Sequence, residues 1–229
     1  MLQSINKKNI YFYFLVFTFL STISNLNFFK NFIQIFVVDN YEINNTSQEI
    51  KNIILDKIKK KNINILFFKD KQKVKSVIDE IKIFDYVEVK KIYPSKLLFN
   101  IKNAEILGVT FLNGKKYYIG SNHKLISANE YSIDMSSPVI FGNFEINDFI
   151  KLLTLLKKNN INVKNINKYF YHQNRRWDLF FENNIILMLP SKNLNNAINI
   201  YKKFENNNNI NENSRIDLRI QNRLILSSD

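Results

Sequence analysis

The feature that most constrains this chain is an uncharged stretch near its start, between Lys8 and Lys30. As an α-helix, residues 9–29 would span about 31 Å, close to the roughly 30 Å hydrocarbon thickness of a bilayer. The first part of the stretch, Ile10–Leu20, is nearly all apolar, whereas polar residues interrupt the second part. We predict a transmembrane helix over residues 9–29.

Two kinds of membrane-targeting segment compete for this stretch. A cleaved signal peptide needs small residues after the apolar run, and the nearest candidate, Ser21–Asn25, is a poor one. An uncleaved anchor fits better. Lys7 and Lys8 lie on its short N-terminal side, so the positive-inside rule places residues 1–8 in the cytoplasm as a short tail. The rest of the chain is then expected outside the membrane.

Composition limits the classes of protein that remain. Apolar residues make up 45% of the 229 residues, so a folded core is expected rather than disorder. The net charge of +13 suggests phosphate binding. However, the excess is mostly lysine scattered among asparagine and isoleucine, with no nucleic-acid-binding motif, and we expect no nucleic-acid partner. Cysteine is absent, which excludes disulfides and thiolate metal sites.

Residues 36–102 have the pattern of a β-α-α-β-β module. Thr46 to Glu49 have the form of a capping box, in which the Thr46 hydroxyl accepts the amide of Glu49 at the start of a helix. Two amphipathic helices follow, because apolar residues recur at helical spacing. Their expected buried residues are Ile50, Ile53, Ile54 and Ile58 in the first and Val74, Val77, Ile78 and Ile81 in the second. Two strands, residues 86–93 and 97–101, complete the module.

Residues 103–229 form a second domain that is mainly β. Asn113–Gly114 between two apolar runs predicts a type I′ hairpin, and residues 120–123 predict a further turn. One helix is expected after Asn147 and another around residues 194–201. Strands are expected at residues 177–181, 185–189, 216–220 and 224–226. Together the patterns predict an α+β fold: a single N-terminal transmembrane helix, the β-α-α-β-β module, and a mainly antiparallel β domain with two helices.

No residue stands out as catalytic, cofactor-binding or metal-binding. His123 and His172 are the only histidines, and neither has a second ligand at metal spacing. Arg175, Arg176 and Trp177 are compatible with an anion or cation–π site. Alternatively, Trp177 anchors the β core while an arginine pairs with Asp178 or Asp217. We expect no cofactor and no enzymatic activity.

Several short motifs, taken in order, resemble those of the FtsQ/DivIB family of bacterial cell-division proteins. They are listed here as they stand: Phe84–Val87, Tyr93–Pro94, Ser137–Gly142, Arg175–Leu179, Leu187–Pro190, and Ile216–Arg219 with Arg223. The resemblance covers nearly the whole chain and implies that residues 36–102 are POTRA-like. The chain departs from the family pattern at Asn103–Gly108 and at Gly120–His123.

The resemblance implies a non-enzymatic septation scaffold in the cell inner membrane, with a cytoplasmic N-terminus, a periplasmic bulk, and enrichment at the division septum. Its expected partners are FtsB-like and FtsL-like divisome membrane proteins. Matching the Asp-Leu-Arg motif carries the partner-binding role onto a segment close to the C-terminus. Its residues are Arg219, Ile220, Gln221, Asn222, Arg223, Leu224, Ile225 and Leu226. In this region a short apolar strand has little chain left to cover its edge, which favours completion of the sheet by a partner.

Three alternatives stay open. A POTRA-type periplasmic chaperone for outer-membrane protein transport would normally carry repeated POTRA modules and a β-barrel. A periplasmic enzyme of unknown type is supported by no specific motif. The C-terminal strand could also simply close the β domain, with no partner at all.

Overall fold

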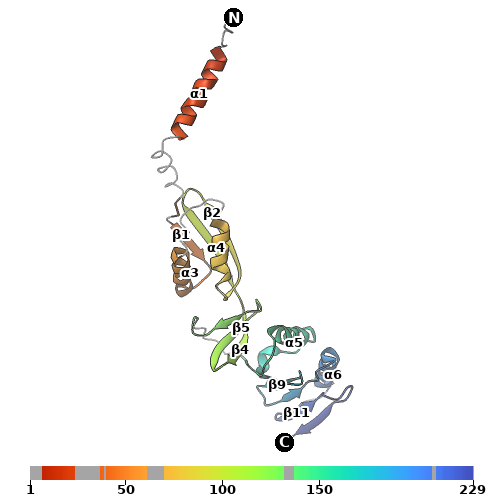
Figure 1. The fold of residues 1–229 in the computed structure, drawn as a ribbon. Helices are drawn as coiled ribbons and strands as arrows, with labels where there is room; N and C mark the ends of the chain where they lie inside the picture. The colour runs from red at the N-terminus through yellow and green to blue at the C-terminus, as the bar shows by residue number, and fades with distance from the viewer. Residues whose placement is uncertain are drawn as a thin grey trace. The chain divides into compact units, whose positions relative to one another are not determined.

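The computed structural model of the chain describes residues 7–23, 37–38, 40–60, 70–131, 137–207 and 210–228 (Figure 1). The fold is mixed α+β, as the sequence predicts. The chain divides into two compact units. The first unit comprises residues 1–81 and 86–102, and the second comprises residues 82–85 and 103–229.

Helix α1 (Lys7–Ile23) covers the apolar part of the predicted transmembrane stretch and exposes most of its aromatic side chains. Residues 24–29 of that stretch lie outside the described residues. Within the described part of the chain, none of the helices combines the length and the apolar character needed to cross a bilayer.

The rest of the first unit is a three-stranded sheet with two helices. Strand β1 pairs in parallel with β3, and β2 lies on the other side of β3. Leu97, Phe99 and Ile101 alternate inward along β3. The elements in chain order are β1 (Asn40–Asn44), α3 (Gln48–Lys60), α4 (Asp70–Asp79), β2 (Phe84–Ile92) and β3 (Lys96–Asn103).

The two helices bury the stripes that the sequence predicts, with small differences. Ile50, Ile54 and Ile58 of α3 are buried, as are Val74, Val77 and Ile81 in and after α4. Ile53 and Ile78 are only half-buried, because they stand at the margins of their stripes.

The capping box predicted at Thr46 is wrong by one residue. Helix α3 begins at Gln48, so Ser47 is its N-cap, and the amide of Ile50 donates to the Ser47 hydroxyl at 3.5 Å. The Thr46 hydroxyl is buried without a hydrogen-bond partner. Asn45 takes a positive φ of 62°, which turns the chain between β1 and the helix and delays the helix start.

The second unit is built on one nine-stranded sheet with the strand order β12-β11-β10-β9-β8-β7-β4-β5-β6. Its strands are β4 (Ile106–Leu112), β5 (Lys115–Gly120), β6 (Leu125–Ser127), β7 (Val139–Phe141), β8 (Ile166–Tyr171), β9 (Trp177–Phe181), β10 (Ile186–Met188), β11 (Ser214–Asp217) and β12 (Ile225–Ser228). Its helices are α5 (Ile146–Lys158), η1 (Val163–Asn165) and α6 (Leu194–Asn207).

The sheet is mixed rather than purely antiparallel. Five of its strand pairs are antiparallel, and β4–β7, β7–β8 and β10–β11 are parallel. Helix α5 connects β7 to β8 and α6 connects β10 to β11, and a crossover helix is what allows consecutive strands to run parallel.

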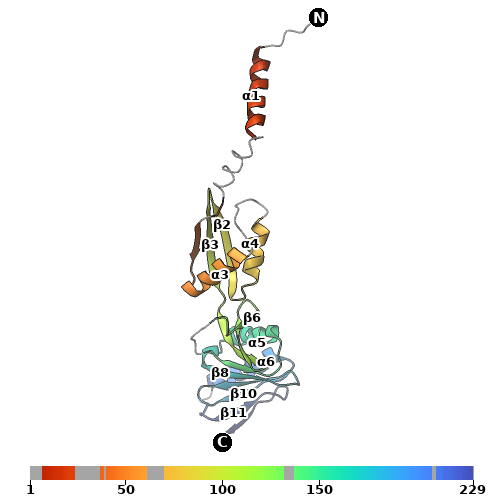
Figure 2. The ribbon, with the colours of Figure 1, turned by 60° about the vertical axis from the view of Figure 1, so that its left-hand side comes forward.

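Both helices cover the same face of this sheet (Figure 2). Successive strand residues point to opposite faces, and one residue per strand, in register, is fully buried against the helices. This buried row comprises Ile140, Tyr169, Leu179, Leu187 and Ile216. From α5, Phe149, Leu152, Leu153 and Leu156 join the core, as predicted from their spacing. From α6, Ala197, Ile198 and Tyr201 do the same.

The turns of the second unit follow the sequence signals. Asn113 and Gly114 have φ values of 51° and 73°, as a type I′ hairpin between β4 and β5 requires. His123, in the turn before β6, has a φ of 62°, and Asn184, in the turn between β9 and β10, has a φ of 61°. Asparagine and histidine tolerate this left-handed region better than most residues.

Candidate partner-binding edge of the large sheet

Strand β12 lies at one end of the strand order and pairs on one side only, with β11. Ile225 and Leu226 expose 48% and 50% of their surface. In a sheet, every other backbone N–H and C=O of an edge strand points away from its neighbour and has no ladder partner. The predicted segment therefore contains an apolar edge strand, beginning at Ile225 rather than at Leu224.

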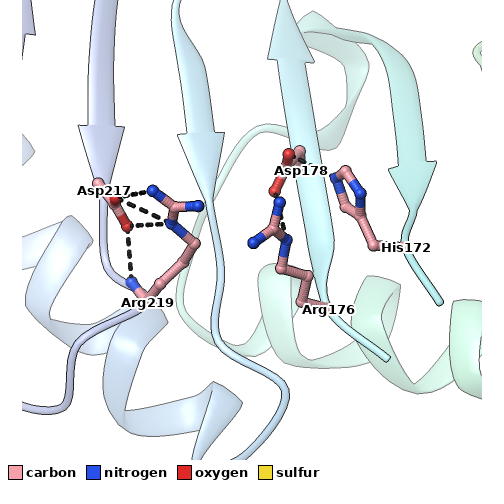
Figure 3. Close-up of polar contacts among 5 residues, drawn as sticks. All are labelled: His172, Arg176, Asp178, Asp217 and Arg219. Carbon is pink, nitrogen blue, oxygen red and sulfur yellow. Dashed lines mark hydrogen bonds and ion pairs between the residues drawn. The ribbon is translucent and has the colours of Figure 1, made fainter. Parts of the chain in front are cut away.

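The predicted strand over residues 216–220 is shorter in the structure, because β11 ends at Asp217. The Asp217 carboxylate accepts the backbone amide of Arg219 at 2.9 Å, which turns the chain away from the sheet. It also accepts the Arg219 guanidinium through Nε at 2.8 and 2.9 Å (Figure 3). Arg219 and Ile220 consequently lie in the turn and not in a strand.

The same contact sets the charge state of the turn. The hydrogen bond from the Arg219 guanidinium lowers the pKa of the Asp217 carboxyl below its ordinary value and outweighs partial burial, which acts in the opposite direction. The Asp217 carboxylate in turn raises the pKa of Arg219. The ion pair thus keeps the turn fixed at neutral pH.

The remainder of the turn presents one exposed apolar residue. Ile220 is 51% exposed, and the amide of Arg223 donates to its carbonyl at 3.2 Å. Asn222, with a φ of 57°, accepts a hydrogen bond from the Asn196 side chain of α6 at 3.0 Å. Leu224 is half-buried and packs against the core. Seven of the eight predicted residues are thereby left facing solvent, and Leu224 is the exception.

A second group of polar side chains surrounds a carboxylate on β9, two strands away from β11 (Figure 3). The Asp178 Oδ2 atom lies 2.6 Å from Nε2 of His172, and its Oδ1 atom lies 3.9 Å from Nε of Arg176. Trp177 is buried in the core. The structural interpretation of Arg175–Asp178 is therefore confirmed, with Arg176 as the arginine that pairs. Arg176 Nε and Asp178 Oδ1 are nevertheless both buried without a hydrogen bond in the described structure.

A cavity of about 310 Å³ lies beside the turn. Its basic lining residues are Arg176, Lys192, Arg219 and Arg223, and the turn residues Ile220 to Asn222 also line it. The Asp217 and Asp178 carboxylates are engaged by Arg219 and Arg176, and no carboxylate is part of the lining. The cavity is thus positively charged and suited to an acidic side chain from another molecule.

Sequence reasoning reached the turn and the strand and named Arg176 in a possible anion site, but it did not place Arg176, Lys192 and α6 beside the turn. Arg176 and Lys192 are more than 25 positions away from Arg219 in the sequence, and the parallel β10–α6–β11 crossover brings Lys192 and α6 to the turn. The Arg175–Leu179 motif was the one available signal.

The described residues include no group of three or more His, Cys, Asp or Glu side chains placed to hold a metal ion. His123 lies in a turn, where its Nδ1 atom is 2.8 Å from Asn147 Oδ1. This fits its interpretation as a turn histidine.

The comparison with known proteins concerns the second unit. Residues 111–219 match the family model of the C-terminal region of the cell division protein FtsQ/DivIB. The match begins near the end of β4 and ends at Arg219, in the turn after β11. No curated protein matches the chain significantly. The family match identifies residues 111–219 of the chain as a C-terminal domain of the FtsQ/DivIB family of cell-division proteins.

Proposed function

We propose that this cell-division protein is a non-enzymatic scaffold of the bacterial inner membrane, which binds FtsB-like and FtsL-like divisome membrane proteins through Arg219–Leu226. The observation that carries the proposal is an open, apolar edge strand next to a basic cavity. A partner strand adds to β12 by β-augmentation, through main-chain hydrogen bonds. An acidic residue of the partner enters the cavity among Arg176, Arg219 and Arg223.

The two halves of this site have different roles. Backbone pairing along Ile225–Ser228 supplies affinity with little sequence preference, whereas side-chain pockets supply specificity. Ile220 and Leu226, both about half exposed, offer apolar contacts on either side of the turn. The Asp217–Arg219 ion pair holds the turn in place before the partner arrives, which lowers the ordering cost of binding.

The test compares two substitutions at one position of β12. Ile225→Pro removes a backbone N–H and cannot take part in a ladder, whereas Ile225→Thr keeps the N–H and a β-branched side chain. We expect the proline variant to lose at least about tenfold in affinity for the FtsB-like partner and the threonine variant to lose less. Affinity is measured with the full chain, and folding is checked by circular dichroism. A folded, membrane-inserted proline variant that captures the partner at full strength would defeat the proposal.

The cavity is tested by charge. Arg219 and Arg176 already pair with Asp217 and Asp178, so Lys192→Glu and Arg223→Glu probe the cavity with less disturbance of the fold. Both should weaken partner capture, and the loss should shrink in high salt, because charge attraction is screened. Lys151→Glu, at an exposed position of α5 that does not line the cavity, is the control with the same change of charge.

We further propose the membrane topology. Residues 1–8 lie in the cytoplasm, residues 9–29 cross the membrane, and a POTRA-like domain of residues 36–102 and the β domain lie in the periplasm. Lys7, Lys8 and the uncharged stretch support this arrangement. Protease added to spheroplasts should remove the large domains and leave a short anchored stub. A fluorescent fusion to the N-terminus should gather at the septum in dividing cells. Protease-protected domains would contradict the topology.

A further inference from the structure

The face of the nine-stranded sheet opposite α5 and α6 is covered by no helix of the described residues. Each residue of the buried row has a sequence neighbour that points to this opposite face. These neighbours occupy adjacent positions from strand to strand. They begin with Lys116 on β5 and end with Ile225 on β12. The row between them comprises Phe111, Phe141, Phe170, Asp178, Met188 and Asp217.

Three adjacent members of this row are phenylalanines, which we call the phenylalanine row: Phe111, Phe141 and Phe170. Phe141 pairs with Phe170 across β7 and β8, and their rings stack with centroids 6.3 Å apart. Thr110 pairs with Ile140 in the parallel strands β4 and β7. Phe111 and Phe141 are the next residues of these strands, so they occupy neighbouring positions on the opposite face. The three side chains are 53%, 40% and 40% exposed. Three aligned, exposed aromatic rings in mid-sheet are costly to leave in water, which marks an interaction surface.

Two lysines of the described strands lie beside the phenylalanine row on this face. Lys116 pairs with Phe111 at the end of the row, and Lys168 lies beside it on β8, opposite Val139. The nearest carboxylate on this face is Asp178, which pairs with Phe170 and is already engaged by His172 and Arg176. The row is thus an apolar strip with cationic flanks, which complements an apolar stripe with acidic flanks.

The spacing of the row indicates the form of its partner. Neighbouring strands lie about 4.8 Å apart, and an α-helix repeats its stripe every turn, at about 5.4 Å. A helix that crosses β4, β7 and β8 can therefore set one side chain against each ring. The row is also distant from the β12 edge: Phe170 and Ile225 are four strands apart, about 19 Å. One added strand at β12 does not cover both.

We propose that the phenylalanine row is a second docking surface, which binds an amphipathic α-helix of another protein with an apolar stripe flanked by Asp or Glu. The surface is separate from the β12 edge and does not depend on the partner proposed there.

A binding assay with the full chain in neutral detergent tests the chemistry. The probe is a labelled helical peptide of roughly 18 residues, with Leu at i, i+3, i+4 and i+7 and Glu on both flanks. A second peptide carries Lys in place of Glu. The double variant Phe141→Ser, Phe170→Ser should bind the acidic peptide at least about tenfold more weakly than the wild type. Tyr86→Ser, which removes an exposed ring of the first unit, is the matched control and should bind normally. Ile225→Pro should also bind normally, which separates this surface from the β12 edge.

Three results would overturn the proposal in this assay. The two peptides could bind equally, or the serine variants could bind as well as the wild type. The wild-type chain could instead bind phosphatidylglycerol vesicles while the serine variants fail to bind them, which would make the row a lipid-binding face. Self-association of the full chain, abolished by the serine variants, would make the occupant a second copy.

Photo-crosslinking in dividing cells identifies the natural occupant. Benzoylphenylalanine replaces Phe141 in one strain and Ile225 in another, and the crosslinked segments are sequenced. Position 141 should capture a segment with a helical apolar stripe and acidic flanks, different from the segment captured at position 225. Capture of lipid, of the chain itself, or of nothing at position 141 would reject the proposal.

Discussion

The large sheet has two edge strands, β6 and β12, which differ mainly in how deeply their apolar side chains are buried. At one end β6 has three residues, and its central Ile126 is fully buried. At the other end β12 has four residues, and Ile225 and Leu226 are about half exposed. Short, buried edge strands are a common protection against unwanted pairing. The second unit closes one edge in this way and leaves the other open.

The apolar side chains exposed on β12 lower solubility, and the buried edge strand β6 avoids this cost. Both strands end antiparallel hairpins and both carry adjacent apolar residues, so their sequences alone look similar. The open edge, however, is the one beside the basic cavity and inside the segment for which we propose partner binding. The contrast between the buried edge strand β6 and the exposed edge strand β12 supports the function proposed for β12.

The largest expected effect comes from placing a charge at each edge. Ile126→Asp buries an unpaired carboxylate and should cost several kcal/mol of unfolding free energy, enough to unfold the domain. Ile225→Asp leaves its carboxylate in water and should cost less than about 1 kcal/mol. Urea unfolding of both variants measures the difference. Comparable losses at the two positions would mean that β12 is covered after all.

A medium effect is expected at the hairpin between β4 and β5, whose second strand pairs with the edge strand β6. Gly114 holds a φ of 73° in the β4–β5 hairpin, which a Cβ disfavours even though no atom lies within 4 Å of its ideal position. Gly114→Ala should therefore cost about 1 kcal/mol. The neighbouring Lys115→Ala is the control and should cost almost nothing. A neutral Gly114→Ala, by the same unfolding measurement, would contradict a type I′ turn.

The smallest effect concerns the Asp217–Arg219 ion pair beside β12. Because the pKa of Asp217 is lowered in the folded state, the pair stabilises the fold above the ordinary Asp pKa of about 4. This contribution is lost as pH falls through the lowered folded-state pKa. Arg219 is partly exposed, so Arg219→Gln should cost less than about 1 kcal/mol at pH 7. The difference between variant and wild type should shrink as the pH falls below the ordinary Asp pKa of about 4. A pH-independent difference would show that packing, not charge, carries the effect.

Local chemistry made much of the second unit predictable. The Asn113–Gly114 turn, the inward stripe of α5 and the strand at Trp177 all follow from residues that act within a few positions of one another. The α3 cap was wrong for the same local reason: Thr46 and Ser47 are both competent caps, and the positive φ of Asn45 selects the second.

By itself, the sequence determined the α+β class, the helices α5 and α6, the family motifs and the segment that ends in an apolar strand, but it did not predict the strands β7 and β8. Only the tertiary structure decided which strands are neighbours, because pairing depends on crossovers that no local pattern encodes. The parallel β10–α6–β11 connection places Arg176 and Lys192 beside Arg219, and the β4–β7–β8 order aligns three phenylalanines 29 and 30 positions apart. A hydrophobic period reports which face a residue occupies, but its neighbour on that face is set by the packing of the whole sheet.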